Sequence, residues 1–222
     1  MPPTARRLRR SDGRGTGHNW PCHRGAGSSR NAAPGQLRLS ADRLPFVTVR
    51  RRFWRVLAPR WAHDPLSGDG AARYGGRWNP RDTPALYMSA ELTTAVAEYQ
   101  QDIGIRPGTF CAYDVAAAWI LDTCQPEVCA ACNIHPSERF APWKTILLIE
   151  GRRPPGWDIA ERLIAAGAAG ILVPSTRIAD GTNLVLWRWN DAPDRRVAAL
   201  DPLADLPRDQ SSWPVAPPPP LR

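Results

Sequence analysis

Segments with the apolar patterning of strands or helices are confined to residues 46–205 of the 222-residue chain. Residues 1–45 are rich in Arg, Gly, Ser and Pro and have no apolar period, so they cannot bury enough surface to offset the entropy of ordering. Residues 206–222 contain six prolines, which favours an extended polyproline tail. The sequence therefore predicts one domain of about 160 residues between a disordered basic tail and a proline-rich tail.

The charge of the chain is distributed unevenly, which limits what it implies about partners. Residues 1–52 hold 12 arginines and two acidic residues, whereas the rest of the chain holds 17 basic and 19 acidic residues. The net charge of +8 therefore belongs to the N-terminal region, and a noncatalytic nucleic-acid-binding protein acting through that region is one hypothesis. The chain has neither a run of about 18 apolar residues nor the apolar stretch of a secretory signal, so we expect a cytoplasmic protein without membrane contact.

The expected secondary structure is short and mixes strands with helices. Apolar runs predict strands at residues 46–57, 85–88, 109–115, 119–121, 170–173 and 184–189. Two helices are expected, one from Ser89 as N-cap to Ile103, and one from the capping-box-like pair Asp158 and Glu161 to Ala166, with Gly167 as the following residue.

The order of these elements indicates the fold class. Residues 58–83, punctuated by proline and glycine, predict a long loop, and residues 145–149 form a further apolar run. Strands and helices do not alternate regularly, and no G-x-G-x-x-G motif follows a strand, so a Rossmann fold has no support. The pattern predicts an α+β domain.

The segment RYGGRWNP, residues 73–80, concentrates aromatic and hydrogen-bonding side chains around two glycines. Gly76 lets a backbone approach a ligand closely, and Arg77 offers a planar fork that suits a diphosphate. Trp78 adds a stacking surface, and Asn79 both donates and accepts hydrogen bonds. This set suits a nucleotide, but a structural turn with a packed tryptophan explains the same residues, so the segment alone leaves both readings open.

A longer match supports the first reading. The sequence WRVLAPRWAHDPLSGDGAARYGGRWNPRDTPALYMSAELTTAVAE and the later GILVPS resemble the RES domain, and the resemblance covers about residues 55–200. Proteins of this family are the toxins of RES–Xre toxin–antitoxin pairs. The resemblance implies an ADP-ribosyltransferase-like fold, which is a split mixed β-sheet flanked by helices. It also implies that NAD is a substrate, cleaved at the nicotinamide–ribose bond, with no further cofactor.

The name-giving residues of the family fall on Arg55, Glu98 and Ser175, and Arg77 and Tyr87 match its other cleft residues. Bond cleavage builds positive charge on the ribose, which the Glu98 carboxylate would stabilise, as in glycoside hydrolysis. Arg55 and Arg77 would hold the diphosphate, Tyr87 would stack on the nicotinamide, and Ser175 would hydrogen bond with the nicotinamide amide or the ribose. The predicted catalytic residues are Glu98 and Arg55, and the predicted NAD-binding residues are Arg55, Gly76, Arg77, Asn79, Tyr87 and Ser175.

The resemblance leaves the acceptor open. Transfer to water makes the protein a glycohydrolase, transfer to inorganic phosphate a phosphorylase, and transfer to a protein side chain an ADP-ribosyltransferase. The implied partner is an Xre-like helix-turn-helix antitoxin, through which the toxin would contact DNA only indirectly.

Four potential soft metal ligands lie close together in the sequence: Cys124, Cys129, Cys132 and His135. Their spacing is compatible with a zinc site, but the second C-x-x-C or His pair of such sites is missing and the resemblance requires no metal. We therefore expect reduced, partly buried thiols and no metal.

Overall fold

A computed structural model of the chain describes residues 43–100, 104 and 106–211. Most of the two predicted tails lies outside these residues. The strands are β1 (Phe46–Leu57), β2 (Leu86–Ser89), β3 (Thr109–Asp122), β4 (Gly170–Pro174), β5 (Thr182–Leu186) and β6 (Arg195–Leu200). The helices are η2 (Pro59–Trp61), α1 (Asp69–Tyr74), α2 (Leu92–Gln100), α3 (Pro126–Ala131), α4 (Pro136–Arg139), α5 (Trp143–Leu148) and α6 (Pro155–Ala165). None of the helices in this described part is long and apolar enough to cross a membrane.

The strands form a mixed sheet that divides into two halves. In the first half, β3 pairs antiparallel with β1 over almost its whole length and with β6 on its other edge. In the second half, β5 lies between β4 and β2, and both pairings are antiparallel. The halves join where the end of β3 runs parallel to β4 and where Trp54 of β1 pairs with Ser89 of β2. The predicted α+β fold with a split mixed sheet is confirmed.

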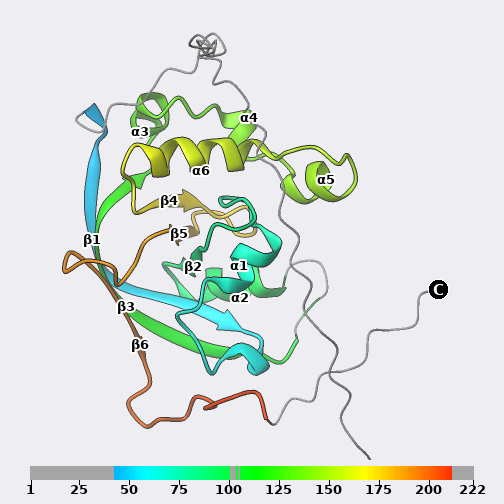
Figure 1. Cartoon of the computed structure of the whole chain (residues 1–222), viewed down its shortest axis with the longest axis vertical. Coiled ribbons are helices and arrows are strands. Elements are labelled where there is room, and N and C mark those ends of the chain that lie inside the picture. The colour runs from blue at the N-terminus through cyan, green and yellow to red at the C-terminus, as the bar shows by residue number, and fades with distance from the viewer. Residues whose placement is uncertain (1–42, 101–103, 105, 212–222) are drawn as a thin grey trace, which may run out of the picture. The chain divides into compact units, whose positions relative to one another are not determined.

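Two hydrophobic cores follow from the alternation of side chains along these strands. One core lies between the halves of the sheet and includes Phe53, Leu86 and Leu184. The other lies between the second half and α6, where Leu163 packs in one cluster with Val185. Figure 1 shows α6 lying along β4 and β5 in this second layer. Residues of β2 and β5 that face this layer also reach the candidate site.

Several expected elements appear with different boundaries. The strands predicted at 109–115 and 119–121 are one strand, β3, although Trp119 has a positive φ of 63°. The predicted loop 58–83 contains the short helices η2 and α1, and the apolar run 145–149 lies largely in helix α5. Strand β6 was not expected, because its sequence begins with two arginines. Leu206, placed in the predicted tail, packs against the core between the half-sheets.

Both predicted helix starts need correction. Ser89 is not an N-cap, because it ends β2 and its hydroxyl donates a hydrogen bond to Asn183, while α2 begins at Leu92. Helix α6 begins at Pro155, three residues before Asp158, and Asp158 and Glu161 instead form ion pairs with Arg153. The predicted helix end near Ile103 lies outside the described residues. After α6, Gly167 adopts φ 95°, as expected for the residue that terminates a helix.

Candidate active site

The Glu98 carboxylate is the centre of a hydrogen-bond network built from separate elements. Glu98 lies on α2, and its Oε1 accepts a hydrogen bond of 2.7 Å from the Ser175 hydroxyl, which directly follows β4. The same Oε1 accepts a second hydrogen bond of 2.7 Å from Nδ2 of Asn183 on β5. Because both donors meet Oε1, they fix the carboxylate and direct Oε2 away from them. The predicted proximity of Glu98 and Ser175 is therefore seen in the structure.

Two neighbouring cavities meet at this carboxylate. The larger measures about 400 Å³ and the smaller about 220 Å³, and Tyr87, Glu98 and Asn183 line both of them. The larger lies within the range of roughly 300–1,000 Å³ that is usual for small-molecule sites. A ligand that occupies either cavity therefore reaches Glu98.

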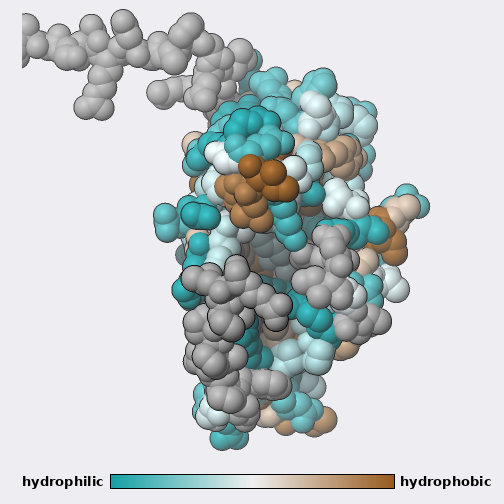
Figure 2. Space-filling model, turned by 90° about the vertical axis from the view of Figure 1, so that its right-hand side faces the viewer, coloured by the Kyte–Doolittle hydropathy of each residue, from teal (hydrophilic) through white to brown (hydrophobic). Residues whose placement is uncertain are grey.

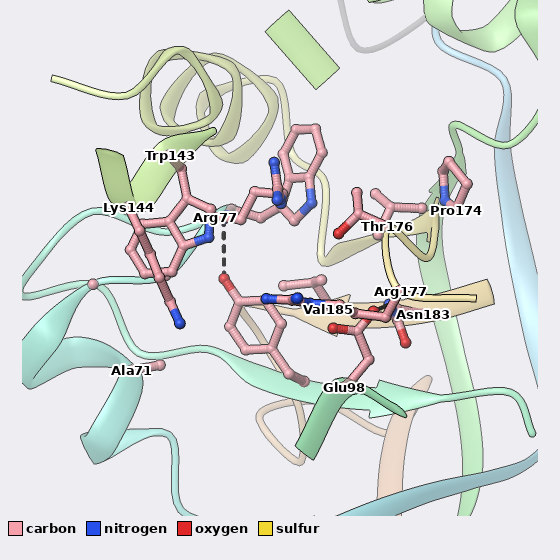
Figure 3. A pocket seen from close by; sticks show the side chains of 15 residues that line it. Ala71, Arg77, Glu98, Trp143, Lys144, Pro174, Thr176, Arg177, Asn183 and Val185 are labelled. Carbon is pink, nitrogen blue, oxygen red and sulfur yellow. Dashed lines mark hydrogen bonds between the residues drawn. The ribbon is translucent and has the colours of Figure 1, made fainter. Parts of the chain in front are cut away.

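The larger cavity is rich in cationic side chains. Arg77, Lys144 and Arg177 line it together with Trp143. In Figure 3, Trp143 and Lys144 project from α5 on the side of the cavity opposite Glu98. Figure 2 views the side of the molecule on which α5 lies and shows a hydrophobic patch above a hollow in the surface. Positive groups around a cavity attract and orient an anionic ligand.

The GGRWN turn directs Arg77 toward the larger cavity. Gly75 has a φ of 74°, which favours glycine, and the Gly76 amide donates to the Asn79 carbonyl at 2.9 Å. The indoles of Trp157 and Trp187 donate to the carbonyls of Gly76 and Trp78, each at 2.7 Å. The turn is thereby held from both sides. Trp78 is only 3% exposed and packs in the second core, so its role is structural.

Gly76 is needed for packing within the protein. A Cβ atom at this position would overlap the Tyr87 hydroxyl and Oδ1 of Asn79, so a larger residue would displace the turn. Gly76 also lines the larger cavity, where its predicted contact with NAD stays a prediction.

The Arg77 side chain forms a hydrogen bond within the protein and also lines the larger cavity. Its Nη1 donates to the Ala141 carbonyl at 2.5 Å, which ties the turn to the connection between α4 and α5. Burial lowers the pKa of Arg77, whereas the nearby Glu98 carboxylate and Tyr87 act in the opposite direction. A cation therefore lies near the carboxylate without forming an ion pair with it.

Tyr87 lines both cavities, and its hydroxyl is hydrogen bonded within the protein. The hydroxyl donates to Oδ1 of Asn79 at 2.7 Å and accepts from the Trp78 amide at 3.0 Å. Burial raises the pKa of Tyr87 well above its ordinary value, so the hydroxyl keeps its proton. The predicted stacking of nicotinamide on this ring stays a prediction.

Asn79 requires a correction, because its side chain is fully buried. Its Nδ2 lies within 3.0 Å of the carbonyl oxygens of Ala71, Pro80 and Thr83. Its Oδ1 accepts the Tyr87 hydroxyl. The amide is therefore used entirely by the protein, and Asn79 supports the turn where we had predicted a contact with NAD.

The Ser175 hydroxyl is hydrogen bonded within the protein. Its hydroxyl donates to Glu98, and its oxygen lies 3.0 Å from the Arg177 amide and 3.4 Å from the Ile178 amide. Ser175 lines neither cavity that meets at Glu98. The hydroxyl therefore orients the carboxylate, and its predicted hydrogen bond to the nicotinamide or ribose stays a prediction.

Arg55 lies apart from Arg77. It is on the face of β1 that Phe53 and Leu57 bury between the half-sheets, and its Nη1 lies 3.4 and 3.5 Å from the carbonyls of Pro65 and Ser67. Burial lowers the pKa of Arg55, and neighbouring Tyr113 partly opposes this change. Arg55 lines the smaller cavity with Glu98 but not the larger one with Arg77. The two arginines assigned to one diphosphate thus face different cavities.

The cysteines near His135 do not form a metal site in the structure. Nδ1 of His135 instead accepts from the Ser137 amide as the N-cap of α4. Cys129 and Cys132 are buried, and Cys129 lies beside Arg139. Within residues 43–100, 104 and 106–211, no three His, Cys, Asp or Glu side chains are placed to hold a metal ion. The zinc alternative therefore gains no support.

The cavity residues that were not predicted from the sequence include Trp143, Lys144, Arg177 and Asn183. Asn183 follows Thr182 at the polar start of β5, and the other three lie in segments without a recognisable motif. No local pattern marks any of them, because each reaches the site only through the folding of distant elements.

Comparison with known proteins agrees with the fold and with the sequence resemblance. The chain is 24% identical over 152 residues to the "Toxin Res" of Yersinia enterocolitica, a match that covers 68% of this chain and 93% of that protein. Its fold is similar to that in the crystal structure of the M. tuberculosis MbcT-MbcA toxin-antitoxin complex, with a TM-score of 0.52 and 21% identity over 73% of this chain and 90% of the other. The family described as RES domain matches residues 52–218, three quarters of the sequence, so the chain belongs to the RES domain family.

Proposed function

We propose that this protein is the toxin of a toxin–antitoxin pair and depletes NAD by cleaving the bond between nicotinamide and ribose. Family membership and the similarity to a protein named Toxin Res support the toxin role. The observation that carries the proposed chemistry is the Glu98 carboxylate, held by two side chains where two cavities meet.

The proposed reaction uses this carboxylate for electrostatic stabilisation. As the bond to nicotinamide breaks, its electron pair leaves with the nicotinamide and positive charge develops on the ribose. Oε2 of Glu98 would face this charge or accept a hydrogen bond from a ribose hydroxyl, while Oε1 stays bound to Ser175 and Asn183. Such an oriented charge stabilises the transition state because it needs no reorganisation during the reaction.

The cations of the larger cavity suit the diphosphate of NAD. Arg77 offers a planar donor fork, and Lys144 and Arg177 add positive charge around the same space. Diphosphate binding there would place the nicotinamide ribose near Glu98 and the ring of Tyr87. Arg55 would then act from the smaller cavity, on the nicotinamide or on the acceptor, and not on the diphosphate.

The acceptor distinguishes three reactions of the same site. Water yields ADP-ribose, inorganic phosphate yields a phosphorylated ADP-ribose, and a protein side chain yields an ADP-ribosylated target. Product analysis by mass spectrometry, with and without phosphate, identifies the acceptor. As protein partner we propose an Xre-like helix-turn-helix antitoxin, which would bring the toxin to DNA only indirectly.

Glu98→Gln tests the proposed reaction. Loss of one oriented electrostatic contact costs roughly 10²–10³ in rate, so NAD consumption by the purified variant should fall by this factor. Glu91→Gln is a matched control, because Glu91 pairs with Arg51 on the surface and lines neither cavity. If Glu98→Gln consumed NAD as fast as the wild type, the proposed role of this carboxylate would be wrong.

Expression in cells tests the toxin role. Wild-type protein should arrest growth with falling NAD, coexpression of the antitoxin should relieve the arrest, and Glu98→Gln should be harmless at equal protein level. Arrest that survives Glu98→Gln but disappears when residues 1–44 are deleted would instead favour a noncatalytic nucleic-acid-binding protein.

A further inference from the structure

We infer that Asn183 is a positioning residue for Glu98 and that Ser89 holds the Asn183 amide in the orientation this requires. The inference rests on the proposed function of Glu98. It adds two residues from paired strands to the network that prepares the carboxylate for reaction.

The hydrogen bonds determine which end of the amide faces Glu98. A carboxylate only accepts hydrogen bonds, so the NH₂ group of Asn183 must point toward it. Oδ1 of Asn183 then faces the Ser89 hydroxyl, which donates to it at 2.7 Å. The chain from Ser89 through Asn183 to Oε1 of Glu98 therefore has a donor and an acceptor at every step.

The pairing of the strands holds this series of hydrogen bonds in place. Ser89 and Asn183 are directly opposite each other in the antiparallel pairing of β2 with β5, and Ser89 is only 4% exposed. Directly opposite residues have adjacent side chains, so the backbone pairing sets their separation. Ser175 approaches Glu98 differently, from the turn after β4 that its amide closes with the Gly181 carbonyl at 2.7 Å. Two independent supports thus hold one carboxylate oxygen.

Asn183 acts through Glu98, although it also lines both cavities. Its NH₂ group is bound to Glu98 and its oxygen to Ser89. Without Asn183 the carboxylate keeps one anchor and can turn about its terminal bond. Because a misplacement of about 1 Å can cost ~10²-fold in rate, we expect Asn183→Ala to lower kcat about 10–100-fold with little change in KM.

Asn183→Asp provides a readout that a purely structural role would not produce. The new carboxyl group would lie beside Glu98, and two carboxyl groups at this distance share one proton at moderate pH. Among the described residues, the other charged side chains that line the two cavities are Arg77, Lys144 and Arg177 in the larger one and Arg55 and Arg106 in the smaller one. Arg77 lines the larger cavity together with Glu98, and the carboxylate opposes the lowering of the pKa of Arg77. The proton would then stay on residue 183, where it donates to Glu98 as the amide does.

The experiment compares full-length wild type, Asn183→Ala, Asn183→Asp and Ser89→Ala by NAD cleavage from pH 5.5 to 9. We expect Asn183→Asp to come within a few-fold of the wild type at low pH and to lose about 10–100-fold when the shared proton dissociates. Asn183→Ala should show its loss at every pH. Asn190→Asp is a structural control, since the Asn190 side chain hydrogen bonds with the backbone of Val197 and Asn190 lines neither cavity.

The outcomes separate this inference from the proposed function. A wild-type protein without NAD cleavage would overturn the proposed function. An active wild type with a pH-independent loss in Asn183→Asp, equal to that of Asn183→Ala, would overturn only the positioning role. Ser89→Ala covers the case in which the Asn183 variants do not fold. It should lower kcat several-fold at unchanged KM, and an unchanged kcat would contradict the inference.

Discussion

At the residue scale, asparagine serves two different purposes in this domain. Asn79 is fully buried and supports the GGRWN turn, whereas Asn183 lies at the cavities and binds Glu98. Both amides bind protein groups through their nitrogen and their oxygen, so composition cannot distinguish a structural from a functional asparagine. The distinction comes from what lies at the other end of each hydrogen bond, a set of backbone carbonyls in one case and a cavity carboxylate in the other.

Asn79→Ala should destabilise the protein strongly. It would leave the Thr83 carbonyl and the donated proton of the Tyr87 hydroxyl without a partner, and the carbonyls of Ala71 and Pro80 with a backbone donor only. Each buried polar group without a partner costs about 1–3 kcal/mol, so we expect the free energy of unfolding in urea to fall by about 3 kcal/mol or more.

Gln125→Ala is the control for this measurement, because the Gln125 side chain makes a long, exposed contact of 3.5 Å with Asp122 and its backbone bonds are kept in the variant. Its effect should stay within about 0.5 kcal/mol. A loss below about 1 kcal/mol in Asn79→Ala would show that water replaces the amide.

At the element scale, the short helix α5 contributes more to the larger cavity than its length suggests. It supplies Trp143 and Lys144, and the preceding connection accepts the hydrogen bond of Arg77 at Ala141. Leu148 and Ile149 at its end are 70% and 80% exposed. Helix α5 is thus linked to the arginine proposed to bind the diphosphate.

Trp143→Ala tests whether α5 binds the adenylate half of NAD. Stacking of a base on an aromatic side chain is worth about 1–3 kcal/mol, so we expect KM for NAD to rise about 10-fold or more. Nicotinamide mononucleotide has no adenylate half, and its cleavage should be unaffected.

Phe140→Ala is the matched control, since Phe140 lies in the same segment, is exposed and does not line the cavity. Equal losses with both substrates would assign Trp143 to the nicotinamide half or to the stability of α5.

At the scale of the whole molecule, the burial of thiol and phenol groups makes the stability of the fold decrease at alkaline pH. Burial raises the pKa of Cys124 and of Cys132 to about 11, from an ordinary value of 9.0. Burial also raises the pKa of Tyr87 and of Tyr113. The folded state therefore holds these protons more tightly than the unfolded state. Their contribution to the free energy of unfolding is complete below the unfolded pKa and is lost as the pH rises through the folded pKa.

We expect the urea midpoint of the reduced protein to fall as the pH rises from 9 toward 11, since the unfolded thiols ionise first. The urea midpoint should fall less steeply with pH in Cys132→Ala, which lacks one of these thiols. This comparison of slopes holds even if the variant is less stable than the wild type at pH 8. A midpoint that does not change over this range, or an equal decline in the variant, would show that these thiols do not contribute.

Local patterning determined much of the fold. The alternation in β1, the apolar run of β4 and the terminating Gly167 were identified from the sequence and are seen in the structure. The failures have a local cause as well, since Ser89 and Asp158 have the side chains of helix caps but are used by the sheet and by Arg153. Glu98 was identified by resemblance and not by periodicity.

Only the tertiary structure decided which polar groups meet. Ser175 and Asn183 are 77 and 85 residues from Glu98 in the chain, and they reach it because β4 and β5 are neighbours in one register. Sequence periodicity reports which face of a strand a side chain occupies, but not which strand lies beside it, and a shift of one residue would turn that face away. For the same reason Arg55 and Arg77, which were expected to hold one diphosphate, line different cavities.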